Sequence, residues 1–134
     1  MSIQHTIAAF LVLALTVGCA TTSTRPTRSE FEDIPVPKGL TYQANKSTII
    51  ESPTVKAARL VYRGRLEVES LGLAMRTTLE ANGWRHVSST SAAEHGITQI
   101  YEKSGSSLEV RLVDGWWYTF VELTASRSQQ QATK

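Results

Sequence analysis

The stretch Leu108-Glu-Val-Arg-Leu-Val-Asp-Gly-Trp-Trp-Tyr-Thr-Phe-Val-Glu-Leu123 decides the fold that the sequence predicts. In it, two runs of alternating character flank the dipeptide Asp114-Gly115. Asp-Gly between such runs favours a tight two-residue turn, because that turn needs positive φ at both central positions. The stretch therefore predicts an antiparallel hairpin with strands over residues 108–113 and 116–123.

A two-residue turn also fixes which residues face each other across the hairpin. Leu112 would face Trp117, and Arg111 would face Tyr118. One face then carries an apolar set that predicts the core: Leu108, Val110, Leu112, Trp117, Val121 and Leu123, with Thr119 as the only polar member. The opposite face carries Glu109, Arg111 and Val113 against Trp116, Tyr118 and Phe120.

This second face combines three aromatic rings with a charge pair, a mixture typical of surfaces that contact another molecule. Trp116, Tyr118, Phe120 and Arg111 are therefore the candidate binding residues. Two alternatives leave these rings covered within the chain itself. Arg111 could stack on Tyr118, or a proline-containing segment nearer the N-terminus could lie over the rings.

The stretch over residues 67–82 is the one clear helix. Val68, Leu71, Met75 and Leu79 follow one another at intervals of three or four residues and form one apolar stripe. Asn82-Gly83 supplies the stop signal, since glycine suits the left-handed conformation after a helix. A core stripe is the interpretation we prefer over a ligand-binding one.

Further strands are predicted over residues 46–51, 55–63, 84–90 and 97–103, with a polar loop running to residue 96. In the second of these, Ala58, Leu60 and Tyr62 share one face, and Arg59, Val61 and Arg63 share the other. Short connections make neighbouring strands antiparallel. The predicted fold class is α+β, with a single amphipathic helix packed on an antiparallel sheet of about five or six strands.

Residues 31–40, which we call the strap, contain Pro35 and Pro37 in alternation and should run extended. Four apolar side chains could pin the strap to the domain: Phe31, Ile34, Val36 and Leu40. The alternative, a proline motif that binds a partner, lacks a second recognition feature.

Composition limits the possible functions. The net charge of +2 is too small to indicate nucleic-acid binding, and the only cysteine leaves no disulfide. His86 and His95 match no metal-ligand spacing, and the sequence has neither a nucleophile turn nor a glycine-rich phosphate loop. We therefore expect a protein that is not an enzyme, with no cofactor and no metal.

The N-terminal sequence predicts where in the cell the protein is located. The uncharged apolar run over residues 7–17 is too short to span a bilayer but fits a secretory signal, here residues 1–18. Thr16-Val17-Gly18-Cys19 resembles the lipobox of bacterial lipoproteins, which implies lipidation of Cys19 with fatty acid. Residues 19–30 would then be a flexible tether, residues 31–125 a compact domain and residues 126–134 a disordered tail.

Several short motifs carry a second resemblance, covering residues 31–125. Ile34-Pro-Val-Pro37, Tyr62-Arg-Gly-Arg65, Asn82-Gly-Trp84 and Tyr101-Glu-Lys103 resemble a group of small bacterial envelope lipoproteins of unknown function. By resemblance to lipoprotein sorting, Ala20 implies an outer-membrane anchor facing the periplasm. The expected function is an adaptor that binds another envelope protein. The alternative is a small-ligand or glycan-binding module of the periplasm.

Overall fold

The computed structural model describes residues 31, 33–92 and 96–128. They form one α-helix and a seven-stranded antiparallel sheet in the order β1-β3-β7-β6-β5-β4, with β2 also pairing β3. The strands are β1 (Thr41–Tyr42), β2 (Thr48–Glu51), β3 (Val55–Gly64), β4 (Arg85–Ala92), β5 (Gly96–Lys103), β6 (Ser106–Asp114) and β7 (Thr119–Ser128). The α+β class is confirmed. The sheet exceeds the expected five or six strands, because the two-residue β1 escaped prediction.

Helix α1 (Val68–Ala81) begins and ends where the sequence indicates. The carboxylate of Glu67 accepts hydrogen bonds from the backbone N–H groups of Glu69 and Ser70, at 2.8 and 2.7 Å. The Ser70 hydroxyl, together with these two N–H groups, holds the pKa of Glu67 below its ordinary value. Gly83 takes a φ of 84° after the last turn. Leu71, Met75 and Leu79 are buried, so the helix contributes its predicted stripe to the core.

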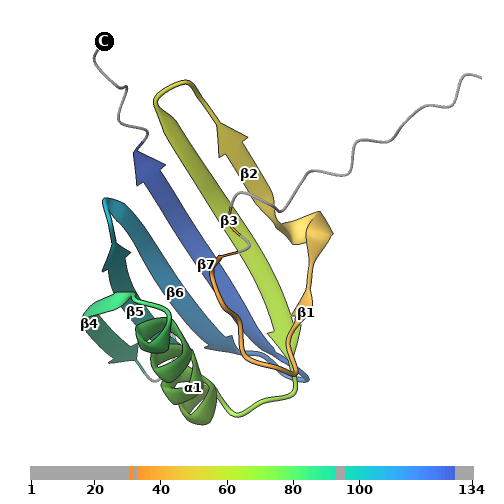
Figure 1. The fold of residues 1–134 in the computed structure, drawn as a ribbon. Helices are drawn as coiled ribbons and strands as arrows, with labels where there is room; N and C mark the ends of the chain where they lie inside the picture. Colours follow the sequence, from red (N-terminus) through yellow and green to blue (C-terminus); the bar gives the residue numbers. More distant parts are fainter. Residues whose placement is uncertain (1–30, 32, 93–95, 129–134) are drawn as a thin grey trace, which may run out of the picture.

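The helix and the strap cover the same face of the sheet (Figure 1). Helix α1 packs over β4, β5 and β6, and the strap, drawn in orange, runs over β7 and β3. Phe31 and Ile34 are buried, with Val36 and Leu40 packed beside them, as predicted. The core between these layers includes Leu60, Tyr101, Leu108, Val110, Leu112, Val121 and Leu123.

One edge of the sheet is interrupted. Strands β1 and β2 both pair with β3, and the 3₁₀ turn η2 (Ala44–Lys46) separates them. The backbone of Val61 stays hydrogen-bonded across this break. Its carbonyl accepts from the N–H of Gln43 at 2.8 Å, and its N–H donates to Ser47 Oγ at 2.9 Å. The edge can therefore bulge at η2 without leaving Val61 unpaired.

The predicted tight turn at Asp114-Gly115 is wrong. Asp114 pairs with Thr119, and residues 115–118 form a four-residue loop closed by a 3.0 Å hydrogen bond from the N–H of Gly115 to the carbonyl of Tyr118. Leu112 therefore faces Val121 instead of Trp117. The shift is four residues, an even number, so every strand residue keeps its predicted face. Residues 116–118 leave the predicted strand for the loop, and Trp117, which was assigned to the core, is 72% exposed there.

The tight turn of the sheet lies one hairpin earlier. Ser104 and Gly105, between β5 and β6, have φ of 48° and 76°, the positive pair that such a turn requires. The polar loop predicted to reach residue 96 is also partly wrong. Its Ser and Thr residues extend β4 to Ala92 along the edge of the sheet, where polar side chains meet solvent. Likewise β7 continues to Ser128, three residues into the predicted tail.

The expectations for residues 1–30, namely the signal peptide, Cys19 and the tether, lie outside the described residues, as does the remainder of the predicted tail. Within the described part of the chain, no helix has the length and apolar character needed to cross a membrane.

Candidate functional site

The face of β3, β7 and β6 opposite helix α1 is the candidate site, and we call it the open face. Residues that pair directly across an antiparallel sheet share a face. The ladder places Val61, Glu122 and Arg111 in one row across the three strands. The adjacent rows are Arg63, Phe120 and Val113 on one side and Arg59, Thr124 and Glu109 on the other.

Cations stand over both aromatic rings of this face. The Lys46 ammonium lies 4.8 Å from the centroid of the Phe120 ring. The guanidinium carbons of Arg63 and Arg65 lie 4.8 and 5.3 Å from the centroid of Tyr118. Each geometry is within cation–π range. The rings are therefore half-buried beneath positive charge.

The sequence suggested two ways to cover these rings, stacking of Arg111 on Tyr118 or the strap, and the structure shows neither. Arg111 is exposed on β6, directly opposite Glu122 of β7. The guanidinium groups that lie over the Tyr118 ring are those of Arg63 and Arg65. The strap lies on the other side of the sheet, in the core layer. The sequence did not predict that Lys46 of η2, Arg63 of β3 and Arg65, just after β3, cover the rings.

The four predicted site residues divide between two places. Arg111 and Phe120 lie on the open face, with Tyr118 at its end beneath the two arginines. Trp116 lies in loop 115–118 at the end of the sheet and is 90% exposed. Trp117, assigned to the core by the sequence, lies next to it. The predicted surface is thus a charged face and a separate aromatic tip.

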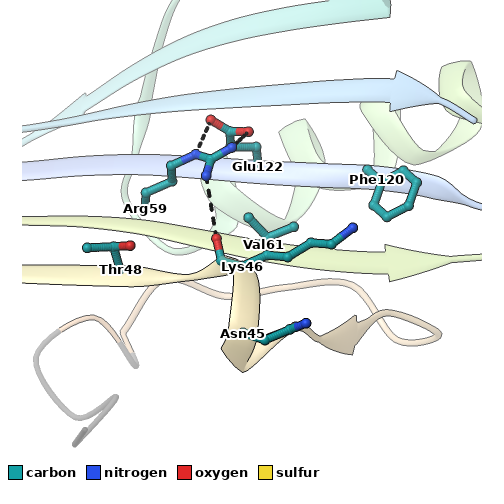
Figure 2. Close-up of a pocket in the computed structure, with 7 residues that line it drawn as sticks. All are labelled: Asn45, Lys46, Thr48, Arg59, Val61, Phe120 and Glu122. Atoms are coloured by element: carbon teal, nitrogen blue, oxygen red, sulfur yellow. Dashed lines mark hydrogen bonds and ion pairs between the residues drawn. The ribbon is translucent and has the colours of Figure 1, made fainter.

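Figure 2 shows a hollow in the open face beside η2. Its volume is about 450 Å³. Its lining residues come from η2, β2, β3 and β7: Asn45, Lys46, Thr48, Arg59, Val61, Phe120 and Glu122. Val61 is its apolar floor, and charged side chains stand around it.

A bidentate ion pair borders the hollow. Arg59 Nε and Nη2 each donate to a carboxylate oxygen of Glu122 at 2.6 Å. Arg59 Nη1 reaches the carbonyl oxygen of Lys46 at 3.5 Å, which ties η2 to the pair (Figure 2). The hydrogen bonds from Arg59 hold the pKa of Glu122 below its ordinary range, and Glu122 raises the pKa of Arg59.

This arrangement favours anionic ligands. Five cationic side chains reach the open face: Lys46, Arg59, Arg63, Arg65 and Arg111. The carboxylates among them are Glu122, which is paired with Arg59, and Glu109. The Lys46 ammonium, over Phe120, and the guanidinium of Arg111, in the adjacent row, offer donors to carboxylate or phosphate oxygens.

The described residues hold no cluster of three or more His, Cys, Asp or Glu side chains placed to bind a metal. His86 is occupied otherwise: its Nε2 lies 2.7 Å from Ser89 Oγ, and its ring packs edge-on against Tyr101. His95 lies outside the described residues.

Sequence reasoning missed Lys46, Arg65 and Trp117 as surface residues. Alternation did place Arg59 and Arg63 together on the non-core side of β3, which was the available signal. No family model, curated protein or solved structure matches this chain.

Proposed function

We propose that this chain is a lipid-anchored, non-catalytic protein of the bacterial cell envelope, an adaptor that binds another envelope protein. The proposed location rests on the sequence of residues 1–19, in which a signal sequence with an apolar run is followed by Cys19. We further propose an outer-membrane anchor facing the periplasm, from Ala20.

The open face carries the adaptor proposal. Its cations stand over Phe120 and Tyr118, and helix α1 packs on the other face of the sheet. Tyr, Phe and Arg are enriched in protein interfaces, and Arg and Tyr are frequent hot spots. The excess of positive charge favours a partner with an acidic surface.

Photo-crosslinking in intact cells tests the partner. A photoreactive residue replaces Thr124 on the open face, and a second variant carries it at Thr77, exposed on helix α1. We expect a discrete protein adduct from position 124 and none from position 77. Arg111→Glu should abolish the adduct, whereas Arg76→Glu on the helix should preserve it. Equal labelling from both positions would contradict the adaptor role.

The hollow supports the second candidate, a small-ligand or glycan-binding module. A volume of about 450 Å³ falls within the range of small-molecule sites. Calorimetric titration with soluble fragments of envelope glycans distinguishes it, because binding that is lost in Phe120→Ala without any protein adduct would favour this alternative.

Lipidation has its own test. Cells fed labelled palmitate should incorporate label into the wild-type chain and not into Cys19→Ser. Outer-membrane fractions should contain the wild-type chain only. Absence of label from the wild type would remove the anchor from the proposal.

A further inference from the structure

Loop 115–118 presents two adjacent tryptophans to solvent. Trp116 is 90% exposed and Trp117 is 72% exposed, while Trp84, the third tryptophan of the chain, is buried. Leu66 lies beside the base of the loop, where its carbonyl accepts a hydrogen bond from Thr119, and its side chain is partly exposed. Two large adjacent rings without cover are unusual for a protein surface and indicate a contact site.

The loop is preformed. Its closing hydrogen bond joins Gly115 to Tyr118, and the Tyr118 ring is held under the guanidinium groups of Arg63 and Arg65. The tryptophans therefore project from a fixed turn. Binding at this tip therefore avoids the entropy cost of ordering a flexible loop.

Two arginines lie directly beside the tip, over the ring of Tyr118. Within the described part of the chain, neither Arg63 nor Arg65 forms an ion pair, so both charges remain available. Lys38 belongs to the neighbouring turn, whose Gly39 faces Leu66. The carboxylates near this end are Asp114, at the base of the loop, and Glu67 and Glu69, which line a hollow together with Asp114; Glu67 also caps helix α1.

We propose that loop 115–118, together with Leu66, Arg63 and Arg65, docks on an anionic phospholipid surface. Tryptophan and tyrosine favour the interface between water and hydrocarbon, where their rings sit at headgroup level. Arginines beside them attract the phosphates of anionic lipids. The tip projects both tryptophans outward, which suits insertion into a soft surface, whereas a protein partner would need a matching pocket for each ring.

The tip lies far from where the chain enters the domain. Asp33 pairs with Arg127 near the end of β7, while the loop precedes the first residue of β7. Ten strand residues separate these ends by about 33 Å. Residues 19–30 could span about 40 Å if extended. A lipid on Cys19 and the tryptophan tip can therefore contact the same bilayer.

The test uses the tryptophans as local probes in the full chain. Vesicles contain phosphatidylglycerol and phosphatidylcholine in equal parts, or phosphatidylcholine alone, with brominated acyl chains as quenchers. Residues 1–30 contain no tryptophan, so any membrane binding by the apolar run over residues 7–17 does not produce the signal. We expect a blue shift and quenching with the anionic vesicles, both weakened by salt.

Variants assign the signal. The double variant Trp116→Ser/Trp117→Ser should lose it, leaving only the unquenched Trp84. Arg63→Gln/Arg65→Gln should weaken vesicle binding by about tenfold or more, since each arginine contributes to attraction by anionic lipid. Arg76→Gln/Arg85→Gln removes the same charge from other surfaces and should bind as the wild type does. Circular dichroism shows whether each variant is folded.

Unquenched loop tryptophans with anionic vesicles would overturn the inference, as would equal quenching by phosphatidylcholine alone. A protein crosslinked from position 116 in cells, without lipid quenching, would assign the tip to a protein instead. The tip shares Arg63, Arg65 and Tyr118 with the open face, but separate variants distinguish this inference from the proposed adaptor site. Arg111→Glu should leave the quenching unchanged, and the tryptophan double variant should keep the adduct from position 124.

Discussion

The side-chain amide of Gln99 donates a hydrogen bond to the carbonyl oxygen of Gly72, 3.1 Å away, and so joins strand β5 to helix α1 inside the core. The same amide accepts from the Tyr101 hydroxyl at 2.8 Å. A β-carbon at Gly72 would lie 3.4 Å from the Ile97 side chain and 3.5 Å from the Gln99 amide nitrogen, both ordinary contact distances, so the helix and β5 are closely packed at this point. A buried polar chain thus connects the two layers.

Gln99→Met should lower the free energy of unfolding by about 1–3 kcal/mol, because the Tyr101 hydroxyl would be left buried without its acceptor. Thr98→Val is the matched control, since Thr98 points to the other side of β5, and it should change stability by no more than about 0.5 kcal/mol. Urea denaturation measures both. Equal losses would mean that the Gln99 bonds contribute nothing specific.

Leu79→Ala on helix α1 should cost about 2–5 kcal/mol, since the side chain is fully buried. Leu73→Ala on the same helix removes a side chain that is 68% exposed and should cost less than about 1 kcal/mol. The difference appears as a lower urea midpoint for the first variant. Similar midpoints would show that the helix packs on a different face.

Substituting a buried tryptophan should lower the free energy of unfolding much more than substituting an exposed one. Trp84→Ala should destabilise the domain by about 3–5 kcal/mol. Trp117→Ala should be within about 0.5 kcal/mol of the wild type, because its ring lies in the exposed loop. Thermal unfolding of the two variants measures this. A large loss at Trp117 would restore the two-residue turn that placed it in the core.

The Arg59–Glu122 ion pair should make the free energy of unfolding depend on pH in the acidic range. The folded-state pKa of Glu122 lies below the ordinary 4.5, so the pair contributes stability above that pH and loses it as the pH falls through the folded pKa. Glu122→Gln should therefore show a shallower decline in unfolding free energy below pH 4.5 than the wild type. Urea titrations at several pH values compare them, and parallel profiles would contradict the pairing.

Local patterns predicted the elements of the fold well. The stripe Leu71, Met75 and Leu79 and the alternation of β3 follow from side-chain periods that need no distant contact. The register of the last hairpin could not follow from alternation, because registers that differ by four residues place the same side chains on the same faces. The choice involves Arg63 and Arg65, more than fifty residues away, which hold Tyr118 in the loop.

The candidate site was predicted in part for the same reason. Aromatic residues and Arg111 could be placed on one face from their spacing alone. Lys46 reaches Phe120 only because η2 interrupts the sheet edge, and no local signal marks that interruption. The cationic character of the face is a property of the assembled ladder.

The strap has a mechanical consequence. Phe31 and Ile34 are core residues, and Arg127 lies over the Phe31 ring and also pairs with Asp33. A pull on the chain ahead of Phe31 therefore loads these few side-chain contacts first and one after another, before it reaches the hydrogen bonds between β1 and β3. Under tension from its N-terminal side, we expect the domain to open its core in an early, low-force step while the sheet remains intact, and single-molecule stretching would resolve that step.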